Sequence, residues 1–187
     1  MIKRILCLIV MLVFPLLAQA EVPVWQIIPA ESTLTFTATQ NGAPVTGKFT
    51  QFSGDIKFDF DNLNESSVNI IVETGSVTAS YKDLVDTLKT SDWFNVKLFP
   101  QAIFKANQFK KTGDKAYQAN GSLTIRDKTV PVTINFNVSS TSDTKVKVSG
   151  STTVKRTAFG VGQGEWSGTD EIKDDVKIEF TLSVVKK

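Results

Sequence analysis

Apolar and polar residues alternate along most of the chain after residue 20, which predicts β-strands with one face turned inward. The clearest run covers residues 129–138, where every second side chain is apolar. The same period recurs in residues 33–38, 55–60, 68–72, 102–106, 117–125, 145–155 and 176–184. Eight or nine antiparallel strands in one chain indicate a closed barrel or a sandwich. Closure would remove the exposed edges that such long strands otherwise present.

Short turn sequences separate these strands. Asn41-Gly42 is typical of a two-residue hairpin turn. Arg126-Asp127-Lys128 separates two long alternating strands, and residues 141–143 separate the next pair. Each of these turns predicts a hairpin between the two strands that it joins.

One segment has the period of a helix instead. In residues 80–88 the apolar side chains are Tyr81, Leu84, Val85 and Leu88, which share one helical face. Ser80 is in position to cap this helix, with Asp83 three residues later. We expect one short helix that flanks or plugs an end of the barrel.

The inward-facing positions combine large phenylalanines with glycines and alanines, which indicates a tapered or partly hollow interior. Residues 156–171 form the longest stretch without alternation and contain four glycines. We interpret it as a loop at the mouth of the barrel, with a simple mobile connection as the alternative.

The first twenty residues have the layout of a secretory signal peptide. Lys3 and Arg4 precede an apolar run of residues 5–18, and Ala18-Gln19-Ala20 supplies a small-residue cleavage site. The run is shorter than the ~20 residues of a membrane-spanning helix. We therefore expect residues 1–20 to be removed on secretion to the periplasm, and residues 21–187 to form one domain.

The composition of residues 21–187 excludes many kinds of chemistry. The chain has no histidine, and its single cysteine, Cys7, lies in the predicted signal peptide. Histidine-based catalytic triads, cysteine nucleophiles, and zinc sites built on His or Cys are therefore impossible. Without Lys3 and Arg4, 19 basic residues balance 19 acidic ones, which argues against a nucleic-acid partner. We expect neither an enzyme, nor a metal, nor a cofactor.

Several motifs together resemble the YceI-like family of secreted, lipocalin-like proteins that bind polyisoprenoids. They are IPAES at residues 28–32, GKF at 47–49 with FSG at 52–54, SDWFNV at 91–96, GSLTI at 121–125 with VPV at 130–132, and RTAFGV at 156–161. They follow one another in the family's order across residues 24–185. The chain departs from the family at Glu31 and Asp127, in regions where members often carry histidine.

The resemblance implies an all-β fold, an extended antiparallel eight-stranded lipocalin-like barrel with its ligand inside. It also implies a carrier or storage protein for an isoprenoid quinone or another polyprenyl lipid. A membrane or a membrane protein would donate and accept that lipid, and the carrier would be a monomer or a homodimer.

Ten residues are our candidates for the wall or mouth of a lipid site. They are Phe36, Phe49, Phe58, Leu84, Leu88, Phe94, Phe104, Phe136, Arg156 and Phe159. For each apolar candidate the alternative is ordinary core packing. Three further inward residues, Val132, Ile178 and Phe180, fit ordinary core packing as well as they fit a cavity wall. Arg156 either donates a hydrogen bond to a polar head group, or is a solvated loop charge, or pairs with a nearby acid.

Two other functions stay open on the sequence alone. One is a periplasmic stress or interaction protein whose barrel is solid, which a cavity would contradict. The other is a hydrolase that uses a carboxylate pair from Asp92, Glu165, Asp170 and Glu171, which would require two of these acids in one cleft.

Overall fold

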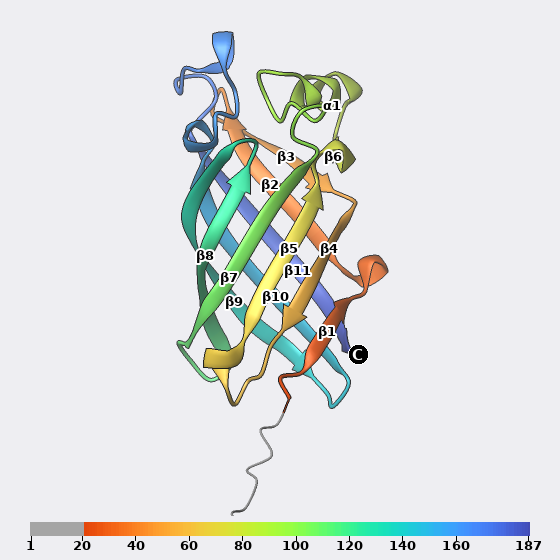
Figure 1. Cartoon of the computed structure of the whole chain (residues 1–187). Coiled ribbons are helices and arrows are strands. Elements are labelled where there is room, and N and C mark those ends of the chain that lie inside the picture. Colours follow the sequence, from red (N-terminus) through yellow and green to blue (C-terminus); the bar gives the residue numbers. More distant parts are fainter. Residues whose placement is uncertain (1–20) are drawn as a thin grey trace, which may run out of the picture.

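The computed structural model describes residues 21–187, so the predicted signal peptide lies outside the described residues (Figure 1). The strands are β1 (Val24–Ile27), β2 (Thr33–Gln40), β3 (Ala43–Phe49), β4 (Phe52–Lys57), β5 (Ser67–Glu73), β6 (Val77–Ala79), β7 (Gln101–Lys111), β8 (Ala116–Ile125), β9 (Lys128–Thr141), β10 (Lys145–Lys155) and β11 (Asp175–Lys186). The α-helix is α1 (Lys82–Lys89). Short 3-10 turns are η1 (Pro29–Glu31), η2 (Leu63–Glu65), η3 (Thr74–Ser76), η4 (Arg156–Phe159) and η5 (Gly164–Trp166).

The strands close into an antiparallel barrel of eight positions, which confirms the predicted fold class. The ring runs β1-β4-β5-β7-β8-β9-β10-β11, and β11 returns to pair with β1. Further along the barrel axis, β2 pairs with β11, β3 with β2 and β6 with β3. The segments β1 and β2 therefore occupy one barrel position, as do β3 and β4, and β5 and β6. In Figure 1 these paired segments lie on one side of the barrel.

The three interrupted positions bend at the same level of the barrel. At η1 the amide of Ile28 donates to the carbonyl of Ser183 at 2.8 Å. One strand further, the amide of Thr50 donates to the carbonyl of Ser76, and the amide of Glu73 donates to the carbonyl of Gln51. The backbone therefore stays paired across these bends, and the sheet turns a corner there.

The predicted turns are confirmed. Asn41 and Gly42 have φ angles of 50° and 79°, the left-handed pair that a two-residue hairpin turn of this kind requires. Ile125 and Lys128 pair across a second two-residue turn, in which Arg126 has a φ of 57°. The β9–β10 turn falls at residues 142–144.

The short helix is confirmed, but its predicted cap is wrong. The helix begins after Tyr81, which has extended backbone angles and no capping hydrogen bond from its side chain. Ser80 is therefore one residue too early to cap it. Leu88 is buried and Leu84 half-buried, so the apolar face turns toward the barrel. Figure 1 shows α1 at the end of the barrel opposite the C-terminus.

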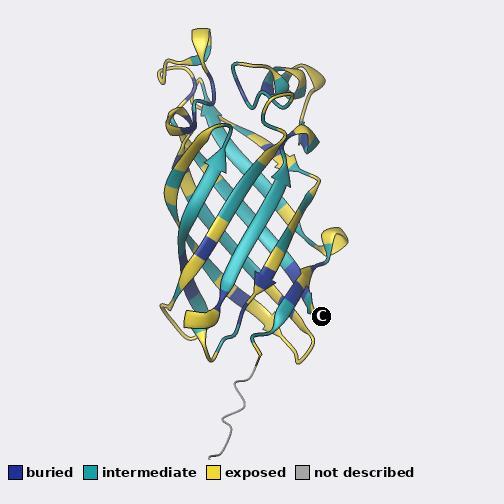
Figure 2. Ribbon diagram, in the orientation of Figure 1, coloured by how far each residue is buried: buried dark blue, intermediate teal, exposed yellow. Residues whose placement is uncertain are grey.

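Tight burial is concentrated at the two ends of the barrel. One buried cluster contains Trp25, Ile56 and Phe58, and the other contains Leu88, Trp93 and Phe159. Between them the inward-facing side chains of the strands are only half-buried, and Figure 2 shows most of the barrel wall in that class. Apolar side chains that face inward and yet stay accessible indicate space inside the barrel.

Two glycines of the wall are covered by phenylalanine rings, as the pattern of small and large residues predicts. A Cβ at Gly47 would lie 2.3 Å from Cζ of Phe36, and a Cβ at Gly150 would lie 2.5 Å from Cζ of Phe180. Both contacts are far inside van der Waals distance, so only glycine leaves these rings their present positions.

The substitution Gly150→Ala is therefore expected to lower the free energy of unfolding by about 1–3 kcal/mol, because it overpacks the wall. The backbone carbonyl of Asn135, 2.7 Å from the added Cβ, leaves little room for relaxation. Gly168→Ala is the control, since nothing lies within 4 Å of its Cβ. Chemical denaturation of both variants checks this, and equal stabilities would contradict the packing argument.

Candidate ligand-binding cavity

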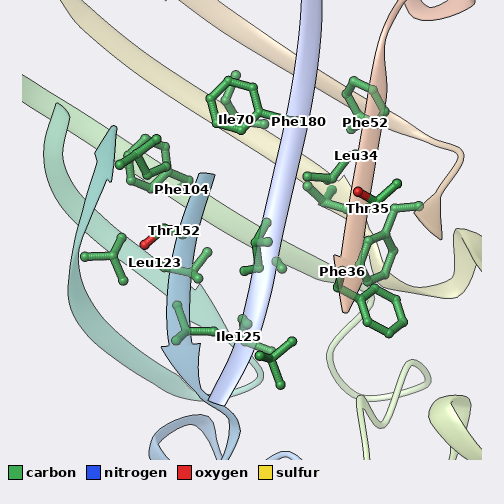
Figure 3. Close-up of a pocket in the computed structure, with 18 of the residues that line it drawn as sticks. Leu34, Thr35, Phe36, Phe52, Ile70, Phe104, Leu123, Ile125, Thr152 and Phe180 are labelled. Carbon is green, nitrogen blue, oxygen red and sulfur yellow. The ribbon is translucent and has the colours of Figure 1, made fainter. Parts of the chain in front are cut away.

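A cavity of about 470 Å³ lies inside the barrel. It extends from Trp25, Phe58 and Phe109 near the chain termini to Leu88 and Trp166 near the helix. Figure 3 shows side chains from different sides of the barrel turned toward the same space. Those labelled are Leu34, Phe36, Phe52, Ile70, Phe104, Leu123, Ile125, Thr152 and Phe180. The solid-barrel alternative is therefore wrong.

Phenylalanine dominates the wall. Of the thirteen phenylalanines, Phe14 lies outside the described residues, and eleven of the other twelve line the cavity. The exception is Phe99, whose ring lies 5.6 Å from the guanidinium of Arg126. Phenylalanine rings offer a large apolar area without hydrogen-bonding groups. The wall is therefore suited to hydrocarbon.

Packed aromatic rings close the cavity near the chain termini. The ring of Phe58 lies 5.0–6.2 Å from those of Phe60, Phe109, Tyr117 and Phe136, with its plane steeply inclined to each of them. Beside them, the indole N–H of Trp25 donates to the carbonyl of Phe58 at 2.8 Å. This end of the barrel therefore has a dense aromatic core, with the Trp25 indole N–H satisfied.

The wall reaches the surface at the opposite end, between α1 and the β2–β3 hairpin. Tyr81 lines the cavity and yet is 58% exposed. The pairing of Ala79 with Gly47 places the start of the helix segment beside β3, whose Val45 also lines the cavity. We identify this boundary as the mouth.

Arg156 lies buried in the cavity wall, with 3% of its surface exposed. Its Nε donates to the carbonyl of Lys173, and its Nη1 donates to those of Val161 and Gly162. Its Nη2 donates to Gly168 at 2.6 Å and to Ile172 at 2.9 Å.

Five N–H groups facing five carbonyls leave Arg156 no donor for a ligand head group. It is not a solvated charge either, and no carboxylate is among its hydrogen-bond partners. The interpretations as a solvated charge and as half of an ion pair are therefore wrong, because Arg156 ties together the loop of residues 161–173; its contact with a ligand stays a prediction.

The charge of Arg156 persists despite its burial. Burial lowers the pKa of Arg156, and the nearby carboxylate of Asp174 acts in the opposite direction. For Asp174 itself, burial raises the pKa, but hydrogen bonds from the amide and hydroxyl of Thr157, together with the positive charges of Lys155 and Arg156, outweigh this effect, so the pKa lies below its usual value. Both groups are ionised at neutral pH.

A second arginine, which the sequence analysis treated only as part of a turn, holds the neighbouring loop. Nη1 of Arg126 donates to the carbonyls of Ser91, Trp93 and Gly160, at 2.6–3.0 Å. Residues 21–187 contain only two arginines against seventeen lysines. A guanidinium presents five N–H donors in a fixed planar fork, against three on the flexible side chain of a lysine, so the scarcity of arginine was a signal for both positions.

The cavity wall includes all ten candidate residues. Their contact with a ligand stays a prediction. Val132, Ile178 and Phe180, for which ordinary core packing fitted equally well, line the cavity too, as do Trp93 and Trp166, which were not among the candidates. Val132, Ile178 and Phe180 lie in the same alternating strand pattern as the candidates. That pattern shows that a side chain faces inward, but it does not show whether the side chain packs in a filled core or lines a cavity.

The acids that a carboxylate-based hydrolase would need do not lie in the cavity. None of Asp92, Glu165, Asp170 and Glu171 belongs to its wall. The one carboxylate on the described wall is that of Asp83, exposed at the mouth.

Residues 21–187 contain no group of three His, Cys, Asp or Glu side chains arranged to hold a metal ion. None of the helices within that range is long and apolar enough to cross a membrane.

Solved structures share this architecture. BcnA of Burkholderia cenocepacia superposes with a TM-score of 0.80 at 31% identity, over 84% of this chain and 98% of that one. A YceI protein of Campylobacter jejuni gives a TM-score of 0.67 at 19% identity, over 75% and 84%. A domain from Saccharophagus degradans, described as a polyisoprenoid binding domain implicated in plant cell wall breakdown, gives 0.70 at 13% identity, over 87% and 98%.

Sequence relatives point the same way. A UPF0312 protein of Vibrio parahaemolyticus is 29% identical over 128 residues, which are 68% of either chain. A UPF0312 protein of Yersinia pestis is 36% identical over 88 residues, 47% of this chain and 45% of that relative. The model of the YceI-like domain matches residues 25–184, from the first strand of the barrel to the last. This chain belongs to the YceI-like domain family.

Proposed function

We propose that the protein is a periplasmic carrier or storage protein for a polyisoprenoid, either an isoprenoid quinone or a polyprenyl lipid. The observation that supports this most is the cavity, long, lined by phenylalanine and aliphatic side chains, and open at one end. The solved relative from Saccharophagus degradans carries the description of a polyisoprenoid binding domain. The signal-peptide layout of residues 1–20 supports the compartment.

Apolar burial alone supplies enough affinity. Each buried CH₂-sized group contributes ~0.8 kcal/mol, so a five-carbon isoprene unit offers about 3–4 kcal/mol. A few units exceed the ~8 kcal/mol of micromolar binding even after the costs of association. The wall therefore binds a prenyl tail without a dedicated polar contact for each unit.

The geometry also supports a way for lipid to enter and leave. Tyr81 and the helix lie at the open end, while the C-terminus and the aromatic cluster lie at the closed end. A tail enters lengthwise through the mouth from a membrane or from a membrane-protein donor. The same opening serves delivery to an acceptor.

Native mass spectrometry of the delipidated protein with added prenyl quinone tests the proposal. We expect one quinone per chain and a dissociation constant in the micromolar range or below. The matched control is the same quinone ring without its prenyl tail, which should bind at least 100-fold more weakly because the tail supplies the binding free energy. If the tail-free ring binds equally well, or if no prenyl lipid binds, the proposal is wrong.

A further inference from the structure

One residue of the cavity wall, Trp93, carries a fully buried side-chain hydrogen-bond donor without a partner in the protein. Among residues 21–187, three buried side-chain N or O atoms lack a partner, namely Asn69 Oδ1, Trp93 Nε1 and Arg126 Nε. Of these three residues, only Trp93 lines the cavity. Buried donors are nearly always hydrogen-bonded, so an unpaired indole N–H on a ligand-sized cavity is a functional feature to be explained.

Other buried donors on the wall are occupied by protein carbonyls. The indole of Trp25 donates to Phe58 at the closed end, and the hydroxyl of Thr74 donates to Phe99. The hydroxyl of Thr152 donates to Thr133, and all five N–H groups of Arg156 are used. A polar group on a buried ligand thus finds its unused donor at Trp93, at the helix end of the cavity.

Trp93 is held rigidly, so its N–H does not turn to reach a protein acceptor. Nη1 of Arg126 donates to its backbone carbonyl at 2.6 Å. The carbonyl of the preceding Asp92 accepts from the amides of Gly162 and Gln163, both at 2.8 Å. The ring of Trp166 lies 5.8 Å away, centroid to centroid, and Trp93 itself is only 8% exposed. A donor fixed in advance is what selective recognition requires.

The charges around Trp93 indicate which kind of group it suits. The guanidinium of Arg156 lies 6.0 Å from the centre of its ring, and that of Arg126 contacts its carbonyl. Two cations, one over the ring of Trp93 and one at its backbone carbonyl, favour an electron-rich oxygen in this region and disfavour another cation. Such oxygens occur on the ring of a prenyl quinone and on the phosphate of a prenyl phosphate. Both lipids therefore carry a hydrogen-bond acceptor at one end of the prenyl tail.

We propose that Trp93 is the polar subsite of the cavity. Its indole N–H donates to an oxygen acceptor on the head of the prenyl ligand and so sets the orientation of that ligand. The head lies beneath the loops that carry Trp93 and Trp166, and the tail extends toward Phe58 and Phe109. This inference rests on the proposed function and adds selectivity, because apolar burial alone does not distinguish the two ends of a ligand.

Affinities for three ligands with tails of equal length test this. They are a prenyl quinone, a prenyl phosphate and the corresponding prenyl hydrocarbon without oxygen, each titrated into the wild type and Trp93→Phe. We expect Trp93→Phe to weaken quinone binding about 5-fold if the acceptor is a carbonyl, or phosphate binding by tenfold or more if it is an anion. Hydrocarbon binding should be unchanged. Trp166→Phe, which alters a neighbouring ring of the same wall, should produce no selective loss.

The outcomes separate this inference from the proposed function. If the wild type binds none of the three, the proposed function is wrong. If the wild type binds but Trp93→Phe weakens all three ligands equally, or none of them, the subsite is wrong and the carrier stands. A selective loss in Trp166→Phe instead of Trp93→Phe would also overturn the assignment.

A spectroscopic measurement on the wild type avoids any question of misfolding. The chain has three tryptophans, Trp25, Trp93 and Trp166, and hence three indole N–H signals in a ¹⁵N-correlated spectrum. An oxygen-bearing ligand should shift the Trp93 signal to a more strongly hydrogen-bonded position, and the hydrocarbon should not. If the Trp93 N–H contacts water and does not respond to any ligand, the subsite is wrong.

Discussion

Replacing Phe104 with aspartate is expected to abolish lipid retention, lowering the affinity for a prenyl quinone by at least 100-fold. Phe104 points into the cavity from β7, between Ile70 of β5 and Leu123 of β8 (Figure 3). An aspartate there would present an unpaired carboxylate to a hydrocarbon tail, which has nothing to offer it, and would hold water in the cavity. Titration with prenyl quinone measures the loss, and Phe136→Asp should have the same effect.

The adjacent residue provides the control. Lys105 follows Phe104 on the same strand but is exposed, on the outer face of the barrel. Lys105→Asp should therefore fold and bind as the wild type does. A Phe104→Asp variant that folds, as judged by circular dichroism, and binds quinone normally would show that this wall does not contact the ligand.

Replacing Arg156 with alanine is expected to lower the free energy of unfolding by about 3–5 kcal/mol. Five carbonyls lose their donors at once, and each unsatisfied buried group costs about 1–3 kcal/mol before water reaches it. Arg156→Lys should recover only a small part of this, because an ammonium group does not reproduce the planar fork. Chemical denaturation measures both differences.

The neighbour Lys155 is the matched control for this change. It is exposed, and its ammonium group pairs with Asp175 at 2.7 Å on the surface. Lys155→Ala should therefore change stability by less than about 1 kcal/mol. If Arg156→Ala is equally mild, the guanidinium does not hold the loop of residues 161–173.

The strand pattern could be predicted because inward and outward positions alternate along every strand. The period predicted the position of β9 and the closed barrel, and the turn sequences between the strands predicted the two-residue turns. It did not predict the bends at η1 and η3, because the alternation on either side of each bend reads as two separate strands. Only the pairing of β11 with both β1 and β2 shows that these are one barrel position.

The apolar wall of the site could be predicted and its polar part could not. Inward phenylalanines such as Phe104 and Phe136 follow from the period together with the excess of phenylalanine over tyrosine. The roles of Arg126, Arg156 and Trp93 depend on which backbone carbonyls come within reach once distant loops meet. Long-range contacts of that kind leave no periodic trace in the sequence.

The most direct test of a hollow, lipid-filled barrel is to locate the bound tail by intermolecular nuclear Overhauser effects from its methyl groups. The account predicts contacts with the rings of Phe36, Phe104 and Phe136 along the length of the cavity. Contacts confined to outer residues such as Leu98, or to the mouth residue Tyr81, would contradict it.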